Sequence, residues 1–288
     1  MSDFIQVAVS GLAQGAIYAL VALGLTVVYR ATTVMNFMHG ESFMLGAFLT
    51  LAMITAWKIP MLLAIPLALL GVFLVGILVD KVGFEPLLKA PHLAQVFATI
   101  ALSFIIKGIV RFFSVDERPL PAIMGFTVLR FGEVVVRPQD LITASAMLVA
   151  TLFLAYVFWK THIGLIMRAG TQTLRGCALV GIDVKRLFSL MWGVGAGLGA
   201  LAGIMAAPML LVYADMGGRP LMLGWAGMTL GGFGTFPGAI VGGVLVGVLE
   251  VAAGYYVSTT LGDVAGFAVI LIVLLIRPQG IFGSREVS

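Results

Sequence analysis

The segment KTHIGLIMRAGTQTLRGCALVGIDVKRL, Lys160 to Leu187, decides how this chain is interpreted. It is basic and punctuated by glycine, and it lies between two long apolar runs in a chain that is 61% hydrophobic. Basic residues between membrane-spanning runs mostly mark cytoplasmic loops. A polar island of this length therefore indicates a segment that meets either a partner or the membrane surface.

Composition places the whole chain in the membrane. Only 10% of its 288 residues are charged, and the mean hydropathy of +1.12 excludes an ordinary soluble domain. The apolar runs are unbroken rather than alternating, which excludes a membrane barrel. The predicted fold class is therefore an all-α membrane protein, a polytopic helical bundle forming one domain over residues 1–288.

About eight transmembrane helices are expected, since each needs roughly 20 apolar residues. The candidate spans are Phe4–Tyr29, Asn36–Trp57, Pro60–Val79, Leu93–Phe113, Asp140–Trp159, Leu187–Val212, a broken region Leu221–Val257, and Leu261–Ile276. The broken region carries Gly231, Gly232, Gly234 and Pro237 in its middle. Such a cluster ends a helix, so we expect a short half-helix, a break and then a full helix.

The placement of Lys and Arg predicts the orientation. The 80–92 loop, the 160–187 loop and the C-terminal tail are expected in the cytoplasm. The 114–138 segment is then an external loop, together with the turn at 215–219. Within the external loop, alternating apolar residues at Phe126–Val136 favour a small hairpin, which either docks an external protein or caps the bundle.

Several kinds of chemistry are missing from the sequence. No Gly-x-x-x-x-Gly-Lys-Ser/Thr motif is present, so any ATP hydrolysis must take place on another chain. The net charge of +4 reflects cytoplasmic loops rather than nucleic-acid binding. Cys177 is the single cysteine, and His39 and Glu41 do not face each other on a helix. A metal site and an intramembrane enzyme are therefore poor fits.

Ionisable residues inside the predicted spans are functional candidates by default. Lys107 and Arg111 lie near an outer helix end, where we expect them to snorkel toward the interface. Glu250 either pairs with a basic residue on a neighbouring helix or lines a pathway. The polar stretch Tyr29–Glu41 is either a tight cytoplasmic turn or a discontinuity lining a translocation path.

Several motifs resemble one family in order along the chain. Asn36-Phe37-Met38-His39-Gly40-Glu41 is similar to the Asn-Phe-Ala-His-Gly-Glu motif of LivH-type permeases of high-affinity branched-chain amino acid ABC importers, with Met38 in place of the usual Ala. The similarity continues through Gly11–Arg30, Gly231–Gly243 and the ending Ile276–Gly283. It covers essentially the whole chain.

This resemblance implies a set of partners and a location. The family works as an importer with a LivM-like second permease, two ABC ATPase subunits and a periplasmic substrate-binding protein, in the bacterial inner membrane and in contact with membrane lipid. ATP and magnesium are bound by the ATPase subunits, so this chain itself needs no cofactor and is not catalytic. Family substrates include leucine, isoleucine and valine, while relatives carry urea or short amides.

The resemblance and the residue patterns described above together give the candidate site residues. A short coupling helix over Gly164–Asp183 is expected to insert into a groove on the ATPase. The ATPase-coupling candidates are Gly164, Arg168, Ala169, Arg175, Ala178, Gly181, Asp183, Lys185 and Arg186. The candidates for the translocation path and its discontinuities are Asn36, His39, Gly40, Glu41, Gly231, Gly232, Gly234, Pro237 and Glu250.

Two other classes of transporter compete with this interpretation. A passive solute channel could use the glycine-rich break as a pore lined by backbone, but it would need no long cytoplasmic loop. A secondary transporter would favour paired intramembrane carboxylates, and only Glu250 stands out. Association with P-loop ATPases distinguishes the importer from both.

Overall fold

The computed structural model describes residues 2–88, 90–113, 116–123, 128–131, 134–162, 164–166 and 183–283. These residues are mostly helical, which confirms the predicted all-α membrane bundle. Within them, six helices are long and apolar enough to cross a membrane. The six are α1 (Ser2–Thr32), α3 (Met61–Val79), α4 (His92–Phe113), α5 (Pro138–Lys160), α8 (Val184–Ala206) and α10 (Phe236–Tyr256).

Among the described residues, three further long helices belong to the bundle, namely α2 (His39–Thr55), α9 (Gly218–Gly231) and α11 (Thr259–Ile276). With 14 residues, α9 is too short to cross a bilayer on its own, and α2, with 17, lies at the lower limit for a spanning helix. The order α9, break, α10 confirms the half-helix, break and full helix predicted for the broken region.

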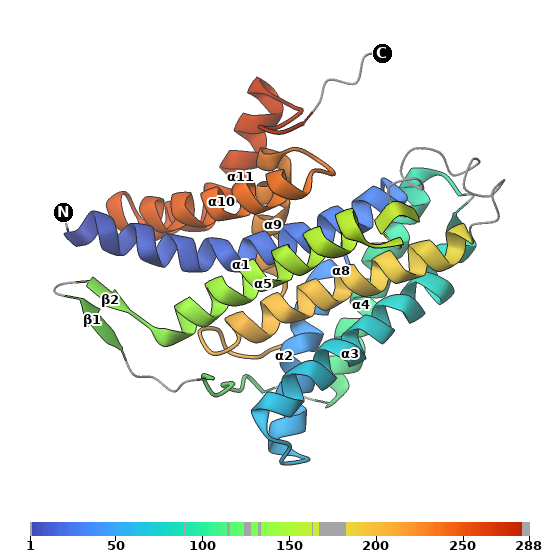
Figure 1. Cartoon of the computed structure of the whole chain (residues 1–288), viewed down its shortest axis with the longest axis horizontal. Coiled ribbons are helices and arrows are strands. Elements are labelled where there is room, and N and C mark those ends of the chain that lie inside the picture. Colours follow the sequence, from blue (N-terminus) through green and yellow to red (C-terminus); the bar gives the residue numbers. More distant parts are fainter. Residues whose placement is uncertain are drawn as a thin grey trace.

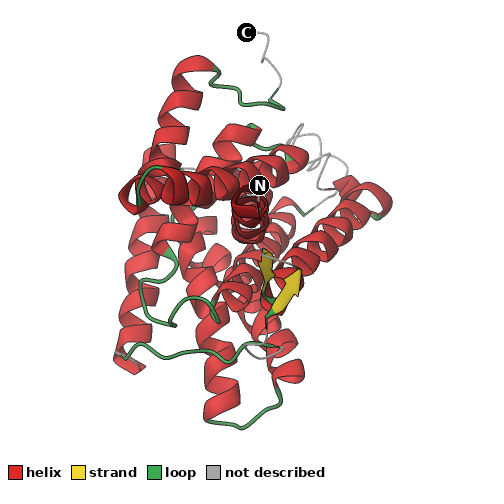
Figure 2. Cartoon of the chain, turned by 90° about the vertical axis from the view of Figure 1, so that its left-hand side faces the viewer, coloured by secondary structure: helices red, strands yellow, loops and turns green. Residues whose placement is uncertain are grey.

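Glycine lets the long helices pack closely. A Cβ atom added at Gly15 of α1 would lie 2.7 Å from the backbone of Val244 in α10, and one at Gly11 would lie 2.7 Å from the backbone of Val248. The residue number rises from 11 to 15 along α1 while that of the contacted residue falls from 248 to 244 along α10, so the two helices are antiparallel. Seen from its N-terminal end, α1 lies in the middle of the other helices (Figure 2). Close backbone approach replaces the hydrophobic effect as the basis of packing between membrane helices.

The bundle contains the same sequence of elements twice, in opposite directions. Each set is a long helix, an interruption, a shorter helix and a second long helix: α1, α2 and α3 form the first set, and α8, α9 and α10 the second. The first helix of each set packs against the last helix of the other, α1 against α10 and α8 against α3 (Figure 1). The starts of the two shorter helices, α2 and α9, also contact each other, at Gly40 and Gly217.

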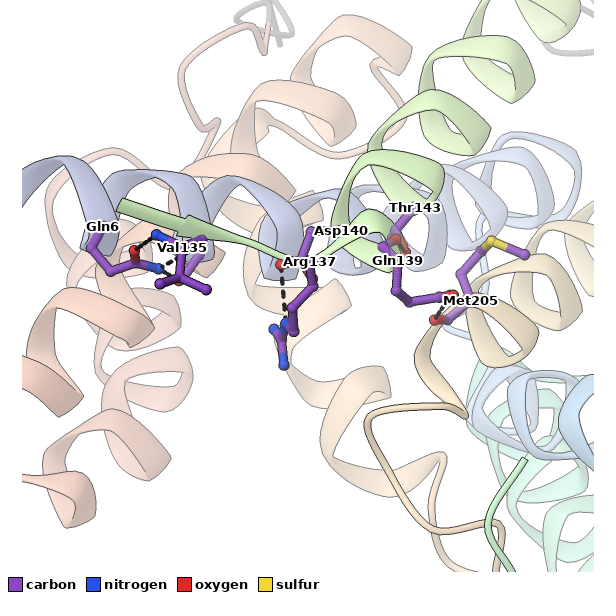
Figure 3. A network of polar contacts seen from close by, with 8 residues as sticks. Gln6, Val135, Arg137, Gln139, Asp140, Thr143 and Met205 are labelled. Atoms are coloured by element: carbon purple, nitrogen blue, oxygen red, sulfur yellow. Dashed lines mark hydrogen bonds and ion pairs between the residues drawn. The ribbon is translucent and has the colours of Figure 1, made fainter. Parts of the chain in front are cut away.

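A small hairpin stands at the N-terminal end of α1 (Figure 1). It pairs β1 (Leu129–Phe131) with β2 (Val134–Val136), which confirms the hairpin predicted in the external loop. The Gln6 side chain of α1 forms two hydrogen bonds to the backbone of β2. Its Nε2 donates to the Val135 carbonyl at 3.0 Å, and its Oε1 accepts from the Val135 amide at 2.8 Å (Figure 3).

The segment that follows the hairpin is fixed to α5 and α8. Arg137 pairs with Asp140 at 3.1 Å, and Gln139 donates to the Met205 carbonyl at 3.0 Å (Figure 3). Residues 118 and 212 add an antiparallel bridge between the external loop and the segment after α8. These contacts hold the described part of the 114–138 loop against the bundle as a cap, while its docking role stays a prediction.

The opposite end of the bundle joins two of the predicted cytoplasmic loops. A π-helical turn (Asp80–Phe84) and a 3-10 turn (Glu85–Leu87) follow α3. Lys185 at the start of α8 pairs with Glu85 at 2.6 Å. The 80–92 loop and the described end of the 160–187 loop at Lys185 therefore lie at the same end, as the Lys and Arg pattern predicted.

Candidate functional site

The starts of α2 and α9 meet inside the bundle. A Cβ atom added at Gly40 would lie 2.9 Å from the carbonyl oxygen of Gly217, and one added at Gly217 would collide with the backbone of Gly40. Only glycine allows two backbones to come this close. We call this contact the helix-start junction. It brings two interrupted helices together at one point, the arrangement by which many transporters build substrate sites.

The interruption before α2 is stabilised from within the protein. Thr33 has a φ of 55°, in the left-handed region. The Asn36 Oδ1 atom accepts the Met38 amide at 3.0 Å, and the Thr99 Oγ1 atom on α4 accepts the Phe37 amide at 3.2 Å. Because α4 satisfies one of these amides and both Asn36 and Met38 are buried, the part of the stretch next to α2 lies inside the bundle, whereas Thr33 and Met35 are exposed.

His39 fills the space behind the junction. Its side chain is fully buried. A Cβ atom added at Gly24 of α1 would lie 2.5 Å from the imidazole ring, and one added at Gly199 of α8 would lie 3.2 Å from it. His39 therefore packs between α1 and α8, whereas Glu41 points to α4, and the two side chains diverge as their spacing predicts.

Glu41 begins a row of alternating charges. Its side chain is 4% exposed, and its Oε1 atom lies 3.4 Å from the Lys107 ammonium. Lys107 also lies 3.6 Å from Asp215, whose side chain is 50% exposed. Arg111 completes the row by donating to Asp215 at 2.5 Å. We call these four residues the charge row, because they lead from a buried carboxylate to an exposed one.

The charge row corrects the expectation for Lys107, which was predicted to snorkel toward the interface but is largely buried and pairs with Glu41. Arg111 is more than half exposed, in agreement with that expectation, and pairs with the half-exposed Asp215. Ser103 also donates to Glu41 Oε1 at 2.7 Å. The second oxygen of Glu41 is buried and has no partner among the described residues. The hydrogen bond from Arg111 holds the pKa of the Asp215 carboxyl below its usual range.

The polar face of α4 that contacts the junction was not identified from the sequence, although the spacing of polar residues in α4 indicates such a face. Polar side chains recur there at every fourth position, the spacing that places residues on one side of a helix. They are Gln95, Thr99, Ser103, Lys107 and Arg111. An apolar helix with one such polar side indicates a buried polar interface, and here that interface is with the α2 interruption and the charge row.

Glu250 forms a separate ion pair. Its side chain is 7% exposed and accepts from Arg219, in the first turn of α9, at 2.6 Å. Of the two roles left open by the sequence, the structure supports pairing with a basic residue on a neighbouring helix. Arg219 and Glu41 thus each belong to the first turn of an interrupted helix, but they carry opposite charges.

The glycine-rich break between α9 and α10 lies at the other end of α9 from the junction. Gly232 and Gly234 have φ values of 109° and 73°, which favour glycine. The carbonyls of Leu230 and Gly231 accept the amides of Ile281 and Phe282, each at 2.9 Å. The C-terminal segment therefore closes this break, so Gly231, Gly232, Gly234 and Pro237 are not brought together with Glu41.

The coupling candidates are only partly described. Arg168, Ala169, Arg175, Ala178 and Gly181 lie outside the described residues, and the coupling helix stays a prediction. Asp183 caps α8 by accepting the amides of Lys185 and Arg186 at 3.1 and 3.2 Å. The Gly164 amide donates to the Thr161 hydroxyl at 3.2 Å. The described flanks of the loop are thus anchored locally.

The chain matches known transport proteins over nearly its whole length. Residues 7–275 match the family model described as the branched-chain amino acid transport system / permease component. The chain is similar to the high-affinity branched-chain amino acid transport system permease protein BraD of Pseudomonas aeruginosa, with 30% identity over 99% of this chain and 97% of that protein. It is also similar to LivH of Escherichia coli K12, with 29% identity over the same shares of the two chains.

Proposed function

Since the chain belongs to the family of permease components of branched-chain amino acid transport systems, we propose that it forms one transmembrane half of an ATP-driven importer. The proposed assembly also holds a second, LivM-like permease and two ABC ATPase subunits, and a periplasmic binding protein delivers the substrate. ATP and magnesium belong to the ATPase subunits. The proposed substrates are leucine, isoleucine and valine, in line with the names of the relatives.

The observation that carries the proposed mechanism is the charge row at the helix-start junction. Buried charge inside a membrane protein is costly and usually marks a pathway. The row alternates in sign and connects the buried Glu41 with the half-exposed Asp215. A free amino acid carries one positive and one negative group, so a row of both signs can meet each group in turn. We assign the outer part of the translocation path to this row.

Coupling to the ATPase is proposed for the 160–187 loop. Lys185 and Arg186 at its end have exposed side chains, and Lys185 pairs with Glu85 of the 80–92 loop. Movement of the loop would be transmitted through α8, whose first turn is capped by Asp183. α8 reaches the junction through Gly199, which packs against His39.

ATPase activity of the reconstituted complex tests the coupling. We expect leucine-loaded binding protein to stimulate ATP hydrolysis, and charge reversal of Arg175 and Arg186 to abolish that stimulation. Stimulation by a urea- or amide-loaded binding protein alone would overturn the substrate but keep the mechanism. If no ATPase assembles with the chain, the importer is wrong and a passive channel takes its place.

Leucine uptake into the same proteoliposomes tests the path. Glu41→Gln removes a charge-assisted contact and is expected to lower uptake about tenfold while the stimulated ATPase activity persists. Asp116→Asn is the matched control, because Asp116 pairs with Arg118 at 3.5 Å outside the charge row. Equal uptake by Glu41→Gln and wild type would remove the charge row from the path.

A further inference from the structure

A second candidate site, an apolar cavity with one basic side chain, lies in the bundle away from the charge row. A cavity of about 590 Å³ opens between α1, α5 and α10. Arg30 lines it from the last turn of α1, Phe158 from the last turn of α5 and Phe236 from the start of α10. The cavity therefore sits where three helices reach the end predicted to face the cytoplasm. Its deeper walls are apolar, formed by Leu23, Leu154, Ala155 and Ile240.

Arg30 is the cation of this cavity, and its described neighbours are aromatic. Its guanidinium carbon lies 5.3 Å from the centre of the Phe158 ring and 5.0 Å from that of Phe236. Among the residues that the structure describes, the guanidinium forms no ion pair or hydrogen bond. Ring faces offset only part of the cost of a charge in apolar surroundings. The site thus has the chemistry to attract an anion.

We propose that this cavity binds one anionic phospholipid of the inner leaflet. The phosphate would be held by Arg30, whose planar donors match phosphate oxygens. One acyl chain would lie along the apolar walls. Basic pockets between transmembrane helices on the cytoplasmic side are suited to anionic headgroups. Trp159, which also lines the cavity and is exposed, is the residue type enriched at headgroup depth.

Lipid is favoured over a protein carboxylate by the shape of the site. A carboxylate from another chain would satisfy Arg30 but leave the apolar walls of the cavity uncovered. A phospholipid matches both parts of the cavity with one molecule. Its phosphate can contact Arg30 at the mouth, and the acyl chain attached to it can lie along the deeper apolar walls. The inference does not depend on the identity of the transported solute.

Native mass spectrometry of the intact importer, purified with its partner subunits, tests the proposal. The complex would be equilibrated with phosphatidylglycerol or phosphatidylcholine, and retained lipid would be counted per permease. We expect retention of phosphatidylglycerol over phosphatidylcholine. Arg30→Gln should weaken that retention about fivefold, the factor for one basic residue near an anionic lipid surface. Arg30→Lys should keep part of it, since the charge remains.

Two further variants make the result specific. Arg277→Gln removes a basic residue at the end of α11 that does not line this cavity, and it should leave retention unchanged. Ala155→Leu occupies the apolar wall and should weaken retention with Arg30 intact. Equal retention by Arg30→Gln and wild type, or equal retention of the two lipids, would overturn the proposal. Absence of retained lipid in the wild type would point to a protein carboxylate instead.

Discussion

The α1–α3 half and the α8–α10 half of the bundle have the same succession of helices but carry opposite charges at the start of the shorter helix. Each interrupts its path through the membrane and starts a shorter helix, and both shorter helices contain Met-Leu-Gly, at Met44–Gly46 in α2 and Met222–Gly224 in α9. Counting back from these triplets, Glu41 and Arg219 occupy equivalent positions. Similar architecture therefore carries different electrostatics in the two halves.

The partners of the two charges differ as well. Arg219 pairs with Glu250 inside its own half, on α10. Glu41 is connected through Lys107 to Asp215, which precedes α9 and is half exposed. One ion pair thus joins two helices of the same half, and the other crosses between halves and reaches the surface. The difference suggests a stabilising role for the first and a transport role for the second.

The largest expected effect is at the helix-start junction, where the two halves touch. Gly217→Ala places a methyl group against the backbone of Gly40, and overpacking of this kind costs about 1–3 kcal/mol. Gly218→Ala is the matched control, since a Cβ atom there has open space around it. Thermal unfolding in detergent measures both. If Gly217→Ala is as stable as Gly218→Ala, the two halves do not rely on this contact.

The next largest expected effect is a difference in stability between variants of the Arg219–Glu250 and Glu41–Lys107 ion pairs. Glu250→Gln should cost about 1–2 kcal/mol of stability, less than a fully buried pair, because Arg219 is partly exposed. Glu41→Gln should cost less, since Lys107 keeps Asp215 as a partner and the new amide can still accept from Ser103. Thermal unfolding of the two variants checks the order. A larger loss in Glu41→Gln would assign the stabilising role to the charge row.

The smallest effect concerns the exposed end of the charge row. Because Arg111 lowers the pKa of Asp215 in the folded protein, the pair contributes stability above the unfolded pKa, and this contribution is lost as the pH falls through the lower folded value. Arg111→Gln should therefore weaken stability at neutral pH slightly and flatten its decline in acid. The exposure of both side chains keeps the effect below about 1 kcal/mol. Unfolding temperatures recorded from pH 7 to pH 3 measure it, with Arg118→Gln as the control.

The sequence predicted the helical bundle because long apolar runs are local signals that need no tertiary information. The external hairpin and the break near Gly232 followed from equally local signals. Composition could not show that α2 and α9 begin inside the bundle, because the depth of a helix start depends on which other helices surround it. The turn at 215–219 was consequently predicted as a plain external connection.

The sequence pattern also could not predict which residues pair with the buried charges. Glu41 and Lys107 are 66 positions apart, and only the packing of α4 against α2 brings them together. The four-residue spacing of polar side chains on α4 was visible in the sequence and would have predicted a buried face for Lys107. Glu250 was recognised as unusual, but its pairing with Arg219 required the fold.

The pairing of Gln6 with β2 gives the first helix a mechanical property. The hairpin is fixed by two hydrogen bonds to the outer end of α1, and α1 continues without interruption for 31 residues, or about 46 Å. At its far end it presents Arg30 beside α5 and α10. A protein that binds the hairpin would therefore contact one end of a single continuous helix. A displacement of that helix would reach the opposite side of the bundle at Arg30 without an intervening loop.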